Sequence, residues 1–114
     1  MMYMPDAIRA TISLMEAPRD TITVRTSYNL TAFSFTAQEL ADEIKSRVPH
    51  FTCRFDPDYH QAIADTWPQD VDDSQARRDW GWEPGFSLGE MVDDMIDHLS
   101  IKLAAAAQSG SALP

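Results

Sequence analysis

The sequence contains the run Asp73-Ser74-Gln75-Ala76-Arg77-Arg78-Asp79-Trp80-Gly81-Trp82-Glu83-Pro84, which constrains the fold more tightly than the segments around it. Asp73 or Ser74 can cap a short helix that continues to about Trp80. Gly81 can end that helix, because glycine adopts the left-handed conformation at low cost. The need for core volume predicts that Trp80 or Trp82 packs beneath the last helix of the chain.

A long helix follows this run. Ser87 and Glu90 have the spacing of a capping box, which marks a helix start. Apolar residues then recur at helical spacing, and they are Leu88, Met91, Val92, Met95, Ile96, Leu99 and Leu103. Ala104–Ala107 can extend the helix, and residues 108–114 indicate a frayed tail. We therefore predict a domain over residues 1–103, with a helix extension and flexible tail over residues 104–114.

Upstream of the run, predicted helices alternate with predicted strands. Apolar residues every three or four positions indicate helices, and strict alternation of apolar with polar residues indicates strands. The elements so predicted are a helix over 5–17, a strand over 22–30, a helix over 36–48, a strand over 51–55 and one helical turn in an irregular loop over 59–72. With the two C-terminal helices the order is α-β-α-β-α-α, a small mixed α/β fold.

Length and charge limit the function. The 114 residues fit one domain, and 44% of them are apolar. The net charge of −9 is uneven, since residues 56–99 alone carry a balance of −10. Such a surface repels phosphate backbones, so no nucleic-acid partner is expected. No apolar run approaches the ~20 residues of a membrane helix, and the single Cys53 fits a reducing compartment.

The machinery of a nicotinamide-dependent dehydrogenase is missing from the sequence. The four glycines form no G-x-G-x-x-G loop of the kind that holds a pyrophosphate. Short-chain dehydrogenases also use a Tyr-x-x-x-Lys pair, in which the lysine lowers the pKa of the phenol. The positions four residues after Tyr3, Tyr28 and Tyr59 hold Ala7, Ala32 and Ile63. The chain alone is therefore expected not to catalyse hydride transfer.

Two acidic groupings are candidate ligands of a divalent cation. They are Asp56, Asp58 and His60 in one, and Asp70, Asp72 and Asp73 in the other. Neither matches an EF-hand, and solvated turn-forming aspartates account for both, so no metal ligand is assigned. Cys53 lies near His50 and His60 and is a formal nucleophile, but its place between two phenylalanines predicts a buried structural cysteine.

Trp67 lies in a stretch without periodicity, between Asp65 and Pro68. A tryptophan in an irregular loop either fills the core or lines a pocket. From the residues alone, filling the core is the favoured role.

Several stretches together resemble one family. They are Met2-Tyr3-Met4-Pro5-Asp6-Ala7-Ile8-Arg9-Ala10-Thr11, Ser27-Tyr28-Asn29-Leu30, Gln61-Ala62-Ile63-Ala64-Asp65-Thr66-Trp67-Pro68, Asp72-Asp73-Ser74-Gln75-Ala76-Arg77 and Asp79-Trp80-Gly81-Trp82-Glu83-Pro84. Residues 1 to about 103 are similar to the C-terminal portion of the L-threonine 3-dehydrogenases, in the extended short-chain dehydrogenase and epimerase superfamily. The Gly81-Trp82-x-Pro84 pattern resembles the whole superfamily, and the first and third stretches resemble the threonine enzymes specifically.

The resemblance implies the substrate-binding C-terminal domain of an NAD-dependent oxidoreductase of threonine catabolism, lacking the Rossmann domain. The full family enzyme converts L-threonine to 2-amino-3-ketobutyrate, with NAD and the catalytic pair held by the absent domain. This chain would then hold no catalytic and no cofactor-binding residue. By resemblance, Trp67 lines the wall that closes over the substrate, and Tyr3 and Met4 lie at the domain junction. Asp65 and His60 are further substrate-binding candidates, although the family tends to have arginine at the position of His60.

A domain without its Rossmann partner is expected to expose apolar surface. The leading candidate is the helix over 5–17, where Ile8, Ile12, Leu14 and Met15 spread wider than one stripe and favour self-association. The resemblance places such a chain in the cytoplasm or, in a eukaryote, the mitochondrial matrix. Two alternatives stay open: a non-catalytic interaction module derived from an epimerase/dehydratase-type enzyme, and an enzyme with its own acidic metal site.

Overall fold

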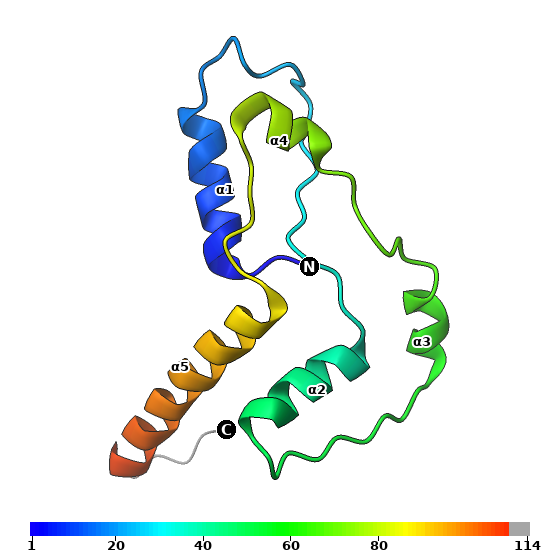
Figure 1. Cartoon of the computed structure of the whole chain (residues 1–114), viewed down its shortest axis with the longest axis vertical. Coiled ribbons are helices and arrows are strands. Elements are labelled where there is room, and N and C mark those ends of the chain that lie inside the picture. Colours follow the sequence, from blue (N-terminus) through cyan, green and yellow to red (C-terminus); the bar gives the residue numbers. More distant parts are fainter. Residues whose placement is uncertain (110–114) are drawn as a thin grey trace.

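The computed structural model describes residues 1–109 and contains five helices in that part of the chain (Figure 1). They are α1 (Met4–Glu16), α2 (Ala37–Arg47), α3 (Tyr59–Ala64), α4 (Ser74–Trp80) and α5 (Leu88–Ser109). Each coincides with a helix or helical turn that the sequence predicts. The predicted tail begins at residue 108, but α5 continues to Ser109. The remaining residues of that tail, 110–114, lie outside the described residues.

Neither predicted strand forms within residues 1–109. Residues 22–30 and 51–55 run as irregular chain (Figure 1). A strand pairs its N–H and C=O groups with a neighbouring strand, but the Thr23 amide binds the Asp79 carboxylate at 3.0 Å instead. The α/β class is therefore only partly visible, because the helices follow the prediction and the strands do not.

The second irregular segment leaves Cys53 exposed, so the prediction of a buried cysteine is wrong. Phe55 beside it is 49% exposed. Alternation buries a side chain only when another element covers that face of the segment. No such element covers residues 52–55, all of which are exposed.

The core lies between α1 and α4. Ala10 of α1, Ala76 of α4 and Trp82 are each at most 1% exposed and form one cluster. Met2, Tyr28, Leu30 and Trp80 pack against it. The Trp82 indole N–H donates to the Thr31 carbonyl at 3.1 Å, which satisfies its only polar group. Trp82 is thus buried as predicted, but its cluster comes from α1 and α4 rather than from the last helix.

The left-handed turn at Gly81 directs Trp82 into this core. Gly81 follows the last residue of α4 and has a φ of 70°. Its N–H donates to the Arg77 carbonyl at 3.2 Å, and the Trp82 N–H donates to the Ala76 carbonyl at 3.3 Å. These two bonds close the helix in the manner that a C-terminal glycine allows.

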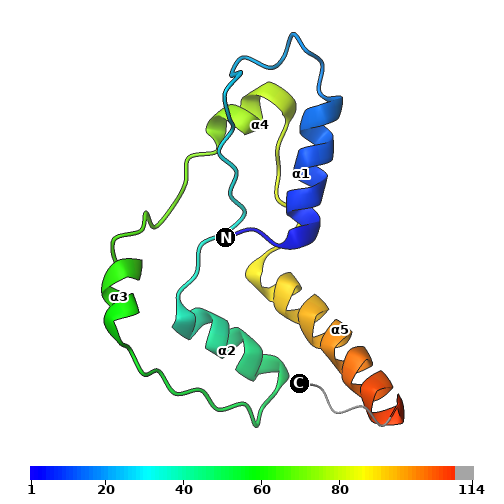
Figure 2. The same ribbon diagram turned by 180° about the vertical axis from the view of Figure 1, so that it is seen from behind.

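A second pair of helices, α2 and α5, packs together on the other side of the molecule (Figure 2). Arg47 near the end of α2 donates to both carboxylate oxygens of Asp93 in α5, at 2.6 and 3.1 Å. Met91 and Val92 are buried in the first half of α5, whereas Leu99 and Leu103 in its second half are 52% and 56% exposed. The apolar stripe of α5 is therefore only half covered.

The molecule is more open than a compact domain of its size. Its radius of gyration is 18.3 Å, against about 13 Å for a compact chain of this length. It exposes 8809 Å², about 2,500 Å² more than a compact monomer of its mass. Within residues 1–109 no helix is both long and apolar enough to cross a bilayer. The open surface identifies faces that other structural elements would cover.

Candidate functional site

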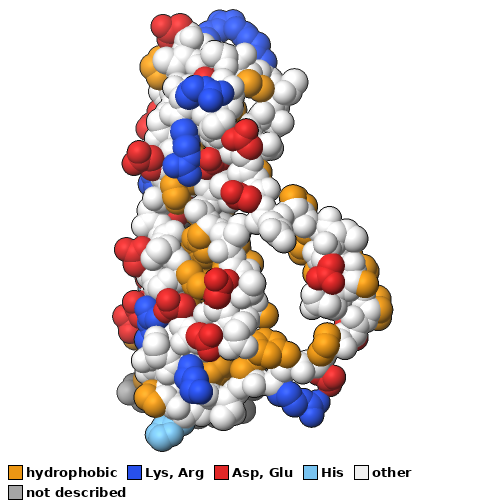
Figure 3. Space-filling model, turned by 45° about the vertical axis from the view of Figure 1, so that its right-hand side comes forward, with side chains coloured by type: hydrophobic (Ala, Val, Ile, Leu, Met, Phe, Trp, Pro, Cys, Tyr) orange, Lys and Arg blue, Asp and Glu red, His pale blue; other side chains and the backbone are white. Residues whose placement is uncertain are grey.

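The predicted substrate-facing residues of the third stretch lie on an arm that stands away from the helix pairs. We define the arm as residues 52–72, which include α3 and are all exposed. Figure 3 shows an opening between the arm and the rest of the molecule. The arm carries apolar side chains that nothing covers, including Tyr59 at 70% and Ile63 at 49% exposed.

Local hydrogen bonds shape the short helix of the arm. The Asp58 carboxylate caps α3 by accepting the backbone N–H of His60 at 2.9 Å, and it lies 2.9 Å from the Nδ1 atom of the His60 ring. The bond from His60 lowers the pKa of Asp58 below its ordinary value. Asp65 follows α3, and its carboxylate accepts the Gln61 side-chain amide at 2.6 Å. Asp65 and His60 are therefore both held by neighbours within the arm.

Trp67 follows α3 directly and is 68% exposed. Its backbone N–H donates to the Ala64 carbonyl at 3.0 Å, which continues the turn beyond the helix. The favoured role from the residues alone, filling the core, is wrong, because the core forms around Trp82 and leaves the arm outside. An exposed indole in this place is available to line a wall against another surface.

Tyr3 lies where α1 begins and links that helix to α5. Its hydroxyl donates to the Asp94 carboxylate at 2.6 Å, and its ring meets Phe86 edge-on at a centroid distance of 5.1 Å. The hydrogen bond to Asp94 raises the pKa of Tyr3 above its ordinary value. Met4, the next residue, is 65% exposed. The neutral phenol of Tyr3 therefore holds the start of α1 against α5, and the side chain of Met4 beside it is exposed.

A buried carboxylate fixes the geometry around Tyr3. Asp6 is fully buried and accepts the backbone N–H groups of Gly85 and Phe86 at 2.9 and 3.1 Å. Arg9 donates to the same carboxylate at 2.7 Å and to the Glu83 carbonyl at 2.5 Å. Burial acts to raise the pKa of Asp6, but the bonds from Arg9, Gly85 and Phe86 together lower it. The first turn of α1 and the loop before α5 therefore form one unit.

The five predicted site residues fall into two separate groups. Trp67, Asp65 and His60 are on the arm, and Tyr3 and Met4 are at the start of α1. In Figures 1 and 2 the arm and the start of α1 lie well apart. Each group therefore lies on one segment of the chain, and the structure does not bring the two groups to one pocket.

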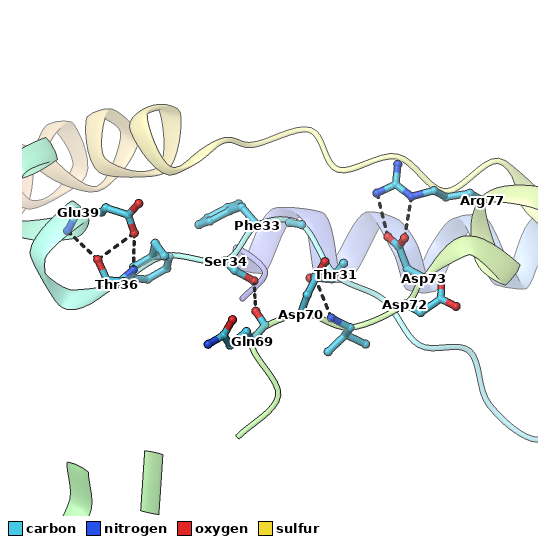
Figure 4. A pocket seen from close by; sticks show the side chains of 13 residues that line it. Thr31, Phe33, Ser34, Thr36, Glu39, Gln69, Asp70, Asp72, Asp73 and Arg77 are labelled. Atoms are coloured by element: carbon cyan, nitrogen blue, oxygen red, sulfur yellow. Dashed lines mark hydrogen bonds and ion pairs between the residues drawn. The ribbon is translucent and has the colours of Figure 1, made fainter. Parts of the chain in front are cut away.

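An open cleft of about 1100 Å³ separates the base of the arm from residues 31–36 (Figure 4). The Ser34 hydroxyl donates to the Gln69 carbonyl at 2.8 Å across it. At one end Arg77 donates to both oxygens of Asp73, at 2.7 and 2.9 Å, and the Arg77 bond lowers the pKa of Asp73. Its apolar lining includes Phe33, Phe35 and Val71. These contacts hold the base of the arm in place. They join a hydroxyl to a carbonyl and an arginine to an aspartate, and neither pair is arranged for proton transfer to a substrate.

The carboxylates of Asp70 and Asp72, at the base of the arm, accept hydrogen bonds from nearby backbone N–H groups. The Asp72 carboxylate accepts the Ser74 N–H at 2.9 Å at the start of α4, and the Asp70 carboxylate accepts the Val71 N–H at 2.8 Å. Within the described residues, no three His, Cys, Asp or Glu side chains gather closely enough to hold a metal ion.

Sequence reasoning missed three carboxylates that organise the molecule. The sequence predicts no contact for Asp6 or for Asp94. Asp79 accepts the Thr23 and Tyr28 hydroxyls, both at 2.6 Å, and these bonds, Thr23 first, lower its pKa to about 2. Each of the three has partners that lie 51 to 91 positions away in the chain, and no local spacing could reveal these long-range contacts.

Comparisons with known proteins identify the relatives of this arrangement. No family model matches the chain. The mitochondrial L-threonine 3-dehydrogenase of Sus scrofa is 49% identical over 98 residues, which are 85% of this chain and 26% of that protein. An uncharacterised epimerase/dehydratase of Staphylococcus haemolyticus is 42% identical over 103 residues, 90% of this chain and 32% of that protein.

Solved structures agree with the sequence relatives. The holo form of the GalE-like L-threonine dehydrogenase of Cupriavidus necator is 56% identical with a TM-score of 0.82, over 87% of this chain and 32% of that one. The L-threonine dehydrogenase of Phytophthora infestans is 48% identical with a TM-score of 0.84, over 90% of this chain and 33% of that one.

The fold is therefore that of the C-terminal portion of a GalE-like dehydrogenase or epimerase. More narrowly, the chain is homologous to the L-threonine 3-dehydrogenases and corresponds to their C-terminal portion. It spans about a third or less of the length of the relatives it matches.

Proposed function

We propose that this chain is the substrate-facing portion of an NAD-dependent L-threonine 3-dehydrogenase, and that it needs a nicotinamide-binding domain for activity. The observation that carries the proposal is the match to solved threonine dehydrogenases, at 56% identity and a TM-score of 0.82 for one of them. The same match spans only 32% of that enzyme, so the reacting groups are assigned to the remaining part.

The residues of this chain do not fit a bound NAD. A pyrophosphate site needs glycine backbone that is open to the ligand. A side chain at Gly85 would meet the Asp6 carboxylate at 3.0 Å, and one at Gly89 would meet Arg47 at 3.1 Å. Gly85 and Gly89 are therefore closed by neighbouring side chains. Gly81 is open but is a single glycine in the turn after α4 rather than part of a glycine-rich loop, so we derive no step through the cofactor here.

The arm supplies the wall that covers the amino-acid substrate. The exposed indole of Trp67 is suited to pack against the threonine side chain and exclude water from the reacting carbon. The Asp65 carboxylate is suited to face the substrate ammonium group, and His60, held by Asp58, to face its carboxylate. Tyr3 keeps the start of α1 in place through Asp94 and leaves Met4 exposed toward the domain junction.

The alternative is a non-catalytic interaction module. The observation that favours it is the excess exposed surface, which indicates a binding role for the chain whatever its chemistry. The two functions differ in the activity of the complex. A substrate-facing portion restores threonine oxidation when it binds a nicotinamide-binding domain, whereas an interaction module binds its partner without restoring that activity.

The test mixes this chain with the nicotinamide-binding portion of the Cupriavidus necator enzyme, made without its matching C-terminal part. We expect NADH to form from NAD and L-threonine in the mixture and in neither component alone. Co-elution of the two polypeptides without NADH formation would support the interaction module instead. NADH formation by this chain alone would overturn the proposal.

A further inference from the structure

Two adjacent carboxylates of α5 bind two different parts of the chain. Asp93 accepts hydrogen bonds from the guanidinium of Arg47, the last residue of α2, at 2.6 and 3.1 Å. Asp94 accepts the hydroxyl of Tyr3, the residue just before α1, at 2.6 Å. Successive residues of a helix point about 100° apart, so one turn of α5 can hold partners on two sides. A series of direct hydrogen bonds therefore joins the start of α1 to the end of α2 through α5.

Both interactions are of a strong and directional kind. A carboxylate makes shorter and stronger hydrogen bonds than a neutral acceptor, and an arginine that binds both of its oxygens also fixes its orientation. Arg47 donates in addition to the Gly89 carbonyl at 3.3 Å, which gives α2 a second attachment to α5. The bond from Arg47 lowers the pKa of Asp93, and the bond to Asp94 raises the pKa of Tyr3. At neutral pH each group is therefore in the protonation state that makes its bond.

The turn of α5 that carries the two carboxylates is the packed part of that helix. Met91 and Val92, directly before them, are both buried. Close-packed side chains transmit a displacement instead of absorbing it, because protein interiors are nearly as dense as organic crystals. We therefore expect this turn of α5 to move as one body with the helix end that Arg47 attaches to it.

The end of α2 sets the direction in which the arm leaves. The Val48 N–H donates to the Ile44 carbonyl at 2.8 Å, and the Phe51 N–H donates to the Val48 carbonyl, also at 2.8 Å. These bonds tie residues 48–51 to the last turn of α2, and the arm starts at residue 52 (Figure 1). The position of the arm therefore depends on the position of α2.

We propose that Asp93 and Asp94 form a conformational link between Tyr3 and the arm, so that the arm changes position when the start of α1 moves against α5. Coupling between distant sites is carried by chains of packed side chains and hydrogen bonds, and small rigid-body shifts of helices are one way in which it operates. The link connects the two groups of candidate site residues that lie apart in the structure. It is a property of the chain itself and does not depend on the proposed function.

The test measures distances between two spin labels in the whole 114-residue chain by pulsed electron paramagnetic resonance. Cys53 is the single cysteine of the sequence and is exposed in the arm, so it carries the first label. A second label at Glu16→Cys, exposed at the end of α1, gives the arm-to-α1 distance. In a separate variant a second label at Ile101→Cys, which is 69% exposed, gives the arm-to-α5 distance.

The Tyr3–Asp94 bond should control one of these distances and not the other. Tyr3→Phe removes the hydroxyl and keeps the ring, so we expect it to shift or broaden the arm-to-α1 distribution. The arm-to-α5 distribution should stay as in the parent chain, because α2 and α5 remain joined. Asp94→Ala should act like Tyr3→Phe, and Asp94→Asn, which keeps an oxygen acceptor, should retain the parent distribution. Arg47→Met should instead alter the arm-to-α5 distribution.

The matched control is Tyr28→Phe, which removes another phenol-to-carboxylate bond of 2.6 Å, to Asp79, outside the link. It should leave both distances unchanged. The proposal is overturned if Tyr3→Phe and Asp94→Ala leave the arm-to-α1 distribution as it is, or if the control changes it as much as they do. A parent distribution as broad as that of Tyr3→Phe would also overturn it. Circular dichroism shows that each variant compared retains its helices.

Discussion

At the scale of single residues, the chain depends on carboxylates that bind backbone amides. Asp6 accepts the amides of Gly85 and Phe86 in a fully buried position, and Tyr3 is held by Asp94 at 2.6 Å. Trp67 is the opposite kind of residue, a large side chain that is 68% exposed and contributes little to the fold. The stability of the chain and its proposed function are therefore assigned to different side chains.

This separation predicts that Asp6→Ala is strongly destabilising. The change leaves two amides and the Arg9 guanidinium without their acceptor, at a cost of about 2–3 kcal/mol. Urea unfolding followed by circular dichroism measures the loss, with Asp20→Ala at an exposed carboxylate as the control. Equal stability of the two variants would show that the Asp6 contacts are dispensable.

The same separation predicts that Trp67→Ala leaves stability unchanged but lowers function. In the complementing mixture, we expect kcat/KM for L-threonine to fall by about tenfold or more, because the proposed function places the indole over the substrate. Ile101→Ala is the matched control, because Ile101 is 69% exposed and lies in α5. An unchanged kcat/KM in Trp67→Ala would remove this residue from the substrate wall.

At the scale of elements, helix signals in the sequence translate directly into structure. The capping box predicted at Ser87 is confirmed, because the Glu90 N–H donates to Ser87 Oγ at 3.3 Å, and a second one starts α2, where the Glu39 N–H donates to Thr36 Oγ1 at 3.2 Å. The strands could not be predicted in the same way, because pairing depends on a neighbour that the segment itself does not encode. For the same reason the local pattern could not show that Cys53 is exposed.

The capping box of α2 gives a direct test. Thr36→Ala removes the side-chain acceptor for the Glu39 amide and should lower the free energy of unfolding by about 1 kcal/mol. Thr36→Ser keeps the oxygen and should keep most of the stability. If both substitutions have the same effect, the cap does not stabilise the helix.

The contact between α4 and the irregular segment 22–30 should depend on pH. The pKa of Asp79 is about 2, below its ordinary 3.8, because Thr23 and Tyr28 donate to the carboxylate. The stabilisation is therefore complete above about pH 4 and is lost as pH falls through about 2. A carboxyl titration by NMR should show the low pKa, and Tyr28→Phe should raise it. An ordinary pKa in the parent chain would contradict the contact.

At the scale of the whole molecule, local order coexists with an open arrangement. The helix pairs α1–α4 and α2–α5 each bury a small core, but the radius of gyration of 18.3 Å shows that the arm and two helix faces lack a cover. The sequence indicated this openness through the excess of apolar residues on α1. It could not show that the two groups of candidate site residues lie apart, since their separation depends on how far the arm extends.

The most direct measurement of the central claim is the activity of a chimaera. Residues 1–103 of this chain would replace the matching portion of the Cupriavidus necator enzyme, with which the chain is 56% identical over 87% of its length. We expect L-threonine-dependent NADH formation by the chimaera and none by the recipient enzyme that lacks the replaced portion. A folded chimaera that binds NAD but does not oxidise L-threonine would contradict this expectation.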